Sequence, residues 1–197
     1  LIFSWNIDSL RPEKWAKLVN FIEKNNPSIV CLNETKGKFE NLAKLFSELT
    51  DYDYIINAHS PSQFHGVAIL IHKDLDWQKL DIKLDCEARS DNRSKDPTIG
   101  RLSAVLIKAN NFAPDVGDLV IVATYSPNSG IDYTNPLKNL TYRIESWDAS
   151  LFQTLQDLQT KYKNVIWIGD INVAPTELDV SHPKVFARHA GFTQEER

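Results

Sequence analysis

The sequence lacks the features that mark several large classes of protein. Its 197 residues include no methionine and only two cysteines. No apolar stretch reaches the ~18 residues that a membrane-spanning helix needs, so we expect no membrane association. Residues 1–7 carry no basic leader or small-residue cleavage site, so they do not resemble a signal peptide. Cys31 and Cys86 lie far apart in the sequence, which favours reduced thiols in an intracellular protein over a disulfide framework.

The sequence also lacks an excess of basic residues. It has 26 acidic and 22 basic side chains, for a formal net charge of −4. That balance argues against a protein that coats nucleic acid by bulk electrostatics. It remains compatible with an enzyme that concentrates acidic residues around a metal and contacts DNA through local basic loops. The length and the ordinary share of apolar residues, 42%, predict a single globular domain over residues 1–197.

Apolar runs alternate with amphipathic segments along the chain. The spacing of apolar residues predicts helices beginning at Pro12, over 39–49 and over roughly 137–162. Continuous apolar or β-branched runs predict strands at 1–7, 28–33, 54–58, 66–72, 77–84, 101–109, 118–125 and 165–173. This order favours an α/β fold of two packed sheets with helices outside. Two polar segments rich in turn residues, 87–100 and 110–117, are predicted to be surface insertions.

Polar side chains suited to metal binding follow four of the predicted strands. They are Asn6 and Asp8, then Glu34, then Tyr125 and Asn128, and finally Asp170 and Asn172. Strand ends are where loops gather and sites form, so these four clusters are expected to converge into one acidic pocket. Carboxylate and amide oxygens of this kind suit Mg²⁺, which keeps several waters and binds few carboxylates. Any one of them alone would be an ordinary turn residue.

Eight segments resemble, in order, the motifs of the exonuclease III / AP endonuclease family, within the endonuclease/exonuclease/phosphatase superfamily. They are WNIDSLR (5–11), LNETK (32–36), GVAIL (66–70), IGR (99–101), YSPNSG (125–130), YRIESWD (142–148), GDINVAPTELDV (169–180) and AGFTQEER (190–197). The YRIESWD segment is similar to a YR-x-x-WD helix in that family. The match covers nearly the whole chain and is far more specific than a single short motif. It implies a four-layer α/β/β/α sandwich and a metal-dependent hydrolase of the AP endonuclease or exodeoxyribonuclease III type.

The resemblance also implies a metal site. Glu34 would be the principal carboxylate ligand of Mg²⁺, for which Mn²⁺ could substitute. Asn6 and Asp8 would line the site directly or through water, and Asp170 and Asn172 would border it.

The catalytic roles that the resemblance implies fall on the same strand ends. Asp170 would orient and deprotonate the attacking water, and Asn172 would donate a hydrogen bond to the phosphate as charge builds. Tyr125 would either support the phosphate and leaving group or help to place the base. Asn128 would hold a phosphate oxygen, and Arg11 would contact the DNA backbone.

The expected partner is double-stranded DNA with abasic sites, cut 5′ to the lesion, with or without additional 3′-5′ exonuclease activity. A monomer in an intracellular, DNA-containing compartment is expected. Two other functions stay open. One is another superfamily phosphodiesterase acting on lipid head groups, inositol phosphates or RNA; the other is a non-catalytic remnant that serves as a binding module.

Several of these residues have ordinary structural interpretations as well. Asp8 could cap the turn into the first helix, Tyr125 could pack on Pro127, and Arg11 could be solvated. Three tryptophans are expected in the core: Trp5, Trp147 and Trp167. The five histidines show no metal-ligand spacing, and Glu177 and Asp179 are expected to structure their loop. Four basic residues form either a DNA-facing loop or a solvated insertion: Arg89, Arg93, Lys95 and Arg101.

The resemblance stops at Arg197. In the family a Trp-bearing segment, an R/K-x-D-Y strand and a terminal S-D-H motif follow, and its Asp and His complete the active site. We therefore expect the domain to be incomplete at its C-terminus and nearly inactive as it stands. The sheet containing 165–173 should be short of strands, with apolar side chains exposed along one side. Smaller departures are Ser9 where the family has Gly and Asn33 where it has Gln.

Overall fold

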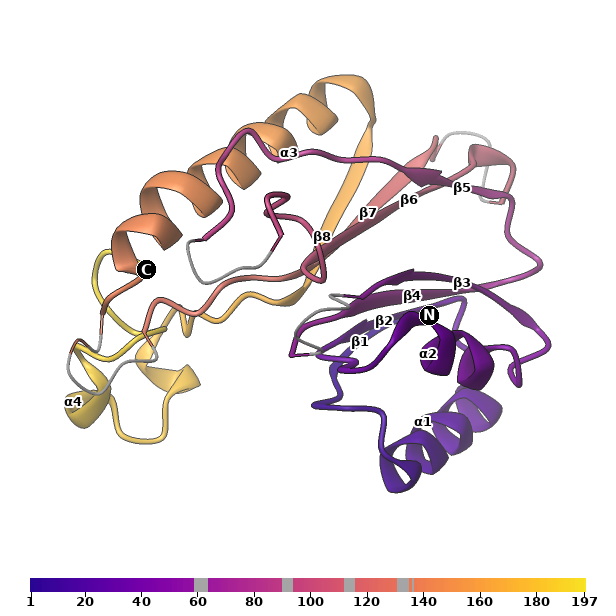
Figure 1. Ribbon diagram of the computed structural model, residues 1–197. Coiled ribbons are helices and arrows are strands. Elements are labelled where there is room, and N and C mark those ends of the chain that lie inside the picture. The colour runs from indigo at the N-terminus through magenta and orange to yellow at the C-terminus, as the bar shows by residue number, and fades with distance from the viewer. Residues whose placement is uncertain (59–63, 90–93, 112–115, 131–134, 136) are drawn as a thin grey trace.

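A computed structural model of the chain describes residues 1–58, 64–89, 94–111, 116–130, 135 and 137–197. The expected tryptophans, carboxylates and amides all lie within these ranges, whereas Arg93 and His59 fall outside them. In the described residues, two four-stranded sheets face each other, with helices on the outer side of each (Figure 1). This is the four-layer α/β/β/α arrangement that the sequence predicts.

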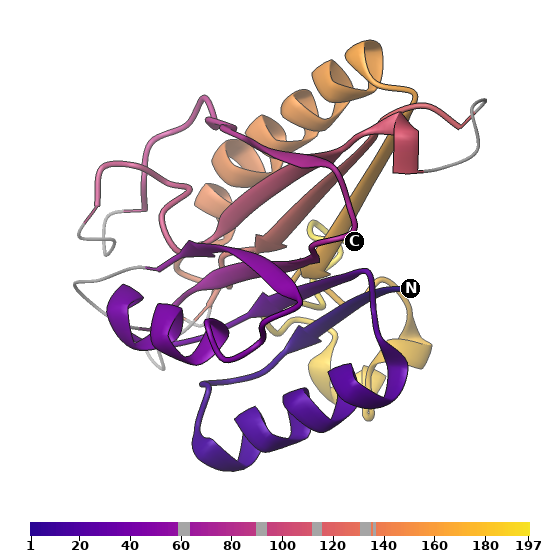
Figure 2. The same cartoon turned by 90° about the vertical axis from the view of Figure 1, so that its right-hand side faces the viewer.

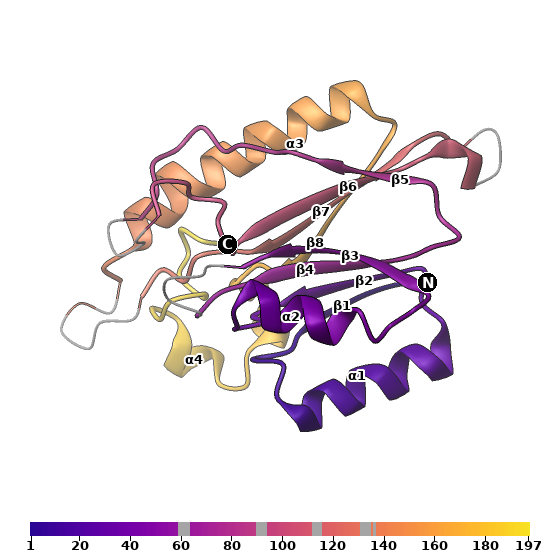
Figure 3. The same cartoon turned by 45° about the vertical axis from the view of Figure 1, so that its right-hand side comes forward.

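The first sheet has the strand order β1-β2-β4-β3. Its strands are β1 (Ile2–Asn6), β2 (Ile29–Asn33), β3 (Tyr52–Asn57) and β4 (Val67–His72). β1 and β2 are parallel, and β4 runs antiparallel to both of its neighbours. Two helices cover the outer face of this sheet, α1 (Pro12–Asn25) and α2 (Phe39–Phe46) (Figure 3).

The second sheet has the strand order β5-β6-β7-β8. Its strands are β5 (Trp77–Leu80), β6 (Leu102–Ile107), β7 (Leu119–Tyr125) and β8 (Asn164–Asp170), of which only β7 and β8 are a parallel pair. The helix α3 (Ala149–Lys161) covers its outer face, as Figure 2 shows from another side. The helical turns before α3, η2 (Tyr142–Asp148), are π-helical. Short helices are η1 (Ala109–Asn111), η3 (Glu177–Asp179) and α4 (Pro183–Phe186).

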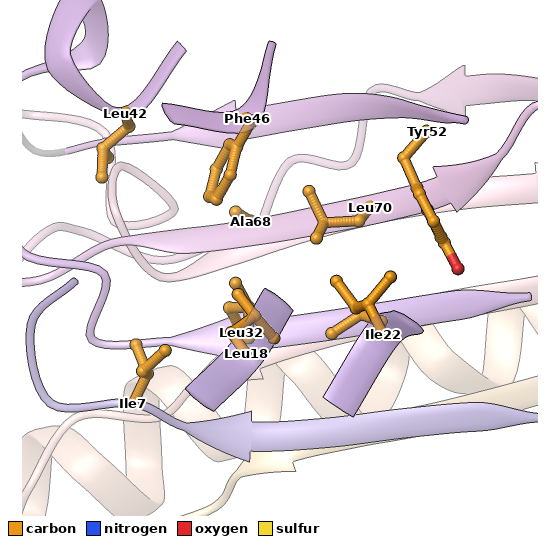
Figure 4. Packing of buried hydrophobic residues seen from close by; sticks show 10 residues of the cluster. Ile7, Leu18, Ile22, Leu32, Leu42, Phe46, Tyr52, Ala68 and Leu70 are labelled. Atoms are coloured by element: carbon orange, nitrogen blue, oxygen red, sulfur yellow. The ribbon is translucent and has the colours of Figure 1, made fainter. Parts of the chain in front are cut away.

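Three apolar layers hold these elements together. Because side chains alternate along a strand, Val30 and Leu32 of β2 face α1 and α2, whereas Cys31 faces the second sheet. Figure 4 shows the outer layer, in which Leu18 and Phe46 project from the two helices onto the first sheet. The third layer lies between the second sheet and α3, around Trp147, Leu151 and Val122. β2 is buried along its whole length, in keeping with its continuous apolar sequence.

The cysteines behave as expected from their settings. Cys31 and Cys86 are both free thiols. Burial raises the pKa of the Cys31 thiol to about 12, so it stays protonated and unreactive at neutral pH. None of the described residues forms a helix long and apolar enough to cross a membrane.

β8 lies at the edge of the second sheet and exposes apolar surface. Trp167, expected in the core, is 38% exposed, and its indole Nε1 donates to Thr124 Oγ1 over 2.8 Å. The expectation of a core position is therefore wrong for Trp167, although Trp147 is fully buried. Phe152 of the neighbouring helix is 63% exposed. The predicted shortage of neighbours beside this strand is confirmed for the described residues, because β8 pairs there only with β7.

Several boundaries differ from the sequence-based expectations. The strand predicted over 77–84 ends at Leu80, and the one predicted over 165–173 ends at Asp170. The segment 87–100 is not a surface insertion throughout, because Thr98 is buried and both Thr98 and Leu102 offer their backbone carbonyls to the Asn57 amide. Glu87, Lys95 and Asp96 of this segment are exposed, as expected, whereas its C-terminal residues are hydrogen-bonded to the end of β3.

The packing of the outer layer indicates which phenylalanine of α2 contributes more to stability. Phe46 is fully buried between α2 and the first sheet, whereas Phe39 at the start of the same helix is 47% exposed. Phe46→Ala should lower the free energy of unfolding by about 3–5 kcal/mol through lost burial and cavity formation. Phe39→Ala, the matched control, should cost much less. Urea denaturation of both variants measures the difference, and equal losses would contradict the assigned packing.

Candidate active site

The candidate site forms where parallel strands of both sheets end. In the first sheet Asn6 is paired with Asn33, so that β1 and β2 end side by side. In the second sheet Tyr125 is paired with Asp170, at the ends of β7 and β8. Asn33 joins the sheets directly beneath the site, because its buried Nδ2 donates to the carbonyl of Thr124 over 2.8 Å. The predicted convergence of strand ends therefore holds in three dimensions.

Asn6 links the two carboxylates of the site. Its Nδ2 donates to Glu34 Oε1 over 2.9 Å and to Asp170 Oδ2 over 2.6 Å. Its Oδ1 accepts from the backbone N–H of Asp8 over 3.1 Å, which fixes the amide with its donor side toward the carboxylates. Two acidic groups from different sheets thus contact the same nitrogen atom.

Glu34 is held ionised by its neighbours. Burial acts to raise the pKa of this carboxyl, but hydrogen bonds from Lys36 and Asn6, together with the Lys36 charge, outweigh burial and lower it. Lys36 Nζ lies 2.6 Å from Glu34 Oε2 and 2.5 Å from Asp8 Oδ1. The ammonium therefore connects the β1 loop to the β2 loop through Asp8 and Glu34.

Tyr125 contributes a neutral phenol. Burial, followed by the negative charge of Glu34, raises the pKa of Tyr125 to about 12, and the phenol donates a hydrogen bond to Glu34. The guanidinium of Arg101 lies over the ring, 5.2 Å from its centroid, and its Nη1 donates to the Tyr125 carbonyl. Tyr125 is therefore a hydrogen-bond donor at neutral pH rather than a base.

The loop after β8 is tied to Asp170 and to the loop after β7. The backbone N–H of Asn172 donates to Asp170 Oδ1 over 2.9 Å, while Asn172 Nδ2 donates to the carbonyl of Ser126 over 2.7 Å. An amide nitrogen carries two hydrogens. Asn172 thus keeps a second N–H available beyond the one that holds Ser126.

Backbone strain is concentrated around the site. In the described part of the chain, six non-glycine residues have positive φ, and five of them are in these loops: Asp8, Ser9, Glu34, Lys36 and Asn172. Such conformations cost of the order of 1–3 kcal/mol each and cluster at functional sites. Ser9, at φ 76°, occupies a position where a glycine would be relaxed, which explains why the similar motif has Gly there.

The donor set fits a hard, partly hydrated cation. Among the described residues no group of three or more His, Cys, Asp and Glu side chains is arranged as a metal site. Glu34 and Asp170 instead supply two carboxylates around the Asn6 amide, and Mg²⁺ typically binds one or two carboxylates and keeps its remaining waters. The arrangement therefore suits Mg²⁺ better than a closed zinc site.

Comparison with known proteins agrees with this geometry. Residues 3–195 match the Endonuclease/Exonuclease/phosphatase family. The chain belongs to this family. Membership confirms the family expected from the eight sequence motifs.

Two similar proteins carry the names of nucleases that act on DNA. A DNA-(apurinic or apyrimidinic site) endonuclease of Dictyostelium discoideum is 32% identical over 196 residues, which cover all of this chain and 48% of that protein. The DNA repair nuclease APEX1 of Danio rerio is 28% identical over 200 residues, all of this chain and 56% of that protein. The chain thus spans about half the length of these relatives.

Solved structures show the same fold. The AP endonuclease LMAP from Leishmania major has a TM-score of 0.77 at 24% identity, covering 99% of this chain and 63% of that one. A 3′-5′ exonuclease, NExo, from Neisseria meningitidis has a TM-score of 0.75 at 20% identity, covering all of this chain and 67% of that one.

Three of the predicted site residues lie at the margin of the candidate site. Asp8 does not cap α1; its carboxylate is largely exposed and pairs with Lys36, Lys14 and Arg11. Arg11 is the N-cap residue of α1, 57% exposed and 3.7 Å from Asp8, which makes it available to a ligand. Asn128 accepts from the Gly130 N–H through its Oδ1, so its side chain structures its own loop.

Other expectations concerned residues outside the centre. Arg101 is 5% exposed and packs on Tyr125, so it belongs to neither a solvated insertion nor a DNA-facing loop. Asp179 accepts from both the N–H and the hydroxyl of Thr176, which confirms the loop-structuring interpretation. Lys36 and Arg101 were missed as members of the site network, although each stands inside a motif that the sequence displays.

The Glu34–Lys36 contact predicts a change in the titration of the site. In metal-free buffer, Lys36→Met should raise the pKa of Glu34, because burial then acts without the neighbouring ammonium. A carboxyl with a lowered pKa stabilises the fold above its unfolded pKa and loses that contribution as the pH falls through its folded pKa. The variant should therefore be less stable than wild type near neutral pH, with the difference shrinking in acid.

Carbon-13 NMR of the Glu34 carboxyl measures this pKa directly. Lys14→Met is the matched control, because Lys14 contacts Asp8 and the Ile7 carbonyl rather than Glu34. An unchanged Glu34 pKa in Lys36→Met would contradict the assigned coupling.

Proposed function

We propose that this chain carries the catalytic residues of a DNA-repair phosphodiesterase that hydrolyses the DNA backbone 5′ to abasic sites. The observation that carries the proposal is the pair of carboxylates, Glu34 and Asp170, held on one Asn6 amide nitrogen where strands of both sheets end. Family membership and the names of the most similar relatives support DNA as the substrate.

Glu34 and Asp170 have different roles in this proposal. Glu34, kept ionised by Lys36 and Asn6, is the principal ligand for Mg²⁺ or Mn²⁺, with Asn6 and Asp8 at the border. When bound there, the metal supplies a Lewis acid for a phosphate oxygen and for the leaving group. Asp170 accepts from the same Asn6 nitrogen through Oδ2 and from the Asn172 backbone N–H through Oδ1, which orients its carboxylate to take a proton from water.

Two neutral donors complete the chemistry. Asn172 uses the N–H that does not hold Ser126 to donate to a phosphate oxygen as negative charge develops. Tyr125, protonated because its pKa is raised to about 12, supports the phosphate and leaving group as a donor and does not act as the base. Asn128 and Arg11 would contact the phosphodiester chain on either side.

The protein acts as a monomer on double-stranded DNA, in a compartment that contains DNA. The exposed edge of β8 supports the view that further residues complete the second sheet and its site. We also propose a 3′-5′ exonuclease activity at the same site.

A nicking assay tests the reaction class. The full gene product is incubated with a duplex that carries one abasic site, with Mg²⁺ and with EDTA. Incision 5′ to the abasic site that EDTA abolishes is expected. Cleavage of inositol phosphates or lipid head groups in place of DNA would assign the protein to another branch of the family, and no hydrolysis with intact metal binding would indicate a binding module.

Asp170→Asn separates catalysis from binding. The substitution should lower kcat at least ~10²-fold, the low end for loss of a general base. Because Glu34 is untouched, Mn²⁺ binding measured by electron paramagnetic resonance should be largely retained. Asp74 follows the C-terminal end of β4 and its side chain is 89% exposed, so Asp74→Asn is the control and should turn over normally. Near-normal turnover of Asp170→Asn would remove this residue from the base role.

A further inference from the structure

Arg143 is a buried cation outside the residues assigned so far. It is 1% exposed, and all three of its guanidinium nitrogens are engaged. Nε donates to both carboxylate oxygens of Asp148 over 2.8 Å. Nη1 donates to the carbonyl of Pro127 and Nη2 to the carbonyl of Ile171, each over 2.7 Å. One rigid, planar group therefore connects three separate segments of chain.

The two carbonyls belong to the loops that carry the catalytic candidates. Ile171 lies between Asp170 and Asn172 in the loop after β8. Pro127 follows Ser126, whose carbonyl receives the Asn172 side chain. Arg143 thus links the β7 loop to the β8 loop through two backbone carbonyls, and the Asn172–Ser126 hydrogen bond links the same loops a second time.

The π-helical turn explains how Arg143 and Asp148 meet. They are five residues apart, which in an α-helix of 3.6 residues per turn would put them about 140° apart around the axis. A π-helix closes its hydrogen bonds from residue i to residue i+5, so this spacing is about one turn. The structure has its π-helix over Tyr142–Asp148, with the Ala149 N–H bonded to the Ile144 carbonyl. The YR-x-x-WD motif that this segment resembles has one residue fewer between its Arg and its Asp than YRIESWD has.

Lysine cannot reproduce this arrangement. The guanidinium fork presents five N–H groups in fixed directions, whereas an ammonium is a compact point charge on a flexible stem. A buried cation that loses one partner is strongly destabilising. The arrangement of donors is therefore specific to arginine.

We propose that Arg143 is a positioning residue: held by Asp148 across the π-helical turn, it sets the distance between the β7 and β8 loops and so aims Asp170 and Asn172. The consequence for activity rests on the proposed function. The consequence for loop order does not, and it can be measured without any substrate.

Three variants test the positioning role in the full gene product. Arg143→Lys keeps the charge and loses the fork. Asp148→Asn keeps the size of the partner and removes its charge, which makes it the milder variant that should fold if Arg143→Lys does not. Leu151→Ala is the matched control for stability, because Leu151 is 1% exposed in the same layer under α3 but holds neither loop carbonyl.

Hydrogen exchange is the readout that does not depend on activity. In Arg143→Lys, and to a smaller extent in Asp148→Asn, amide exchange should rise about tenfold or more within 126–130 and 170–174 while the β6–β7 core stays protected. In Leu151→Ala, amide exchange in the two loops should rise no more than the variant's loss of global stability accounts for. Equal exchange in the loops of wild type and both test variants would overturn the proposal, whatever the enzyme cleaves.

Kinetics provide the second readout. With an abasic duplex, kcat should fall about 10²-fold in Arg143→Lys, the size expected for misplacement of catalytic groups by about 1 Å. KM should change much less. A fall in kcat of the same size in Leu151→Ala would show a general loss of stability and overturn the specific role. If wild type itself does not cleave the duplex, the proposed function fails, and hydrogen exchange alone decides the role of Arg143.

A deletion tests the five-residue spacing. Removing the exposed Glu145 brings Arg143 and Asp148 to a separation of four, which an ordinary α-helix places on one face. Loop exchange and kcat close to wild type are expected. Losses as large as those of Arg143→Lys would contradict the assignment of the π-helical turn to this pairing.

Discussion

The hydrogen bonds from one amide nitrogen, Asn6 Nδ2, to two carboxylates are the contacts on which the candidate site depends. Asn6 ends a strand of the first sheet and Asp170 ends a strand of the second. Two carboxylates left side by side would repel each other, and the shared donor together with Lys36 opposes that repulsion. The contact forms only if the two sheets stack in one register, so the geometry of the site depends on the packing of the core.

Buried polar groups around this contact make the site part of the framework rather than a set of loose loops. Asn33 joins β2 to β7 beneath it, and Arg101 supports Tyr125 from the side. Arg143 donates to one backbone carbonyl in each of the two loops that follow β7 and β8. Groups fixed in this way need little rearrangement when charge develops, which is how preorganised sites stabilise transition states. The strained backbone at Glu34 and Asn172 is maintained by the same network.

Most of the elements could be predicted from local sequence because each has a strong pattern of its own. β2 is a continuous apolar run, and α1 starts at a proline and repeats apolar residues with helical period. The strand ends with their carboxylates and amides were predictable for the same reason. Trp167 was misjudged, since an apolar sequence does not reveal whether a strand is central or at an edge. Arg101 was misjudged because a charged side chain is buried only when partners from elsewhere in the chain meet it.

The sequence by itself determined the elements, their order, the family and the residues that could carry the chemistry, because these depend on local patterns and motifs. Tertiary structure decided which of those residues meet. It brought Asn6, Glu34 and Asp170 together, turned Asp8 toward Lys36, and gave Arg143 its two loop carbonyls. The physical reason is that these contacts join segments far apart in the chain, so they are fixed by how the two sheets and α3 pack rather than by any local preference.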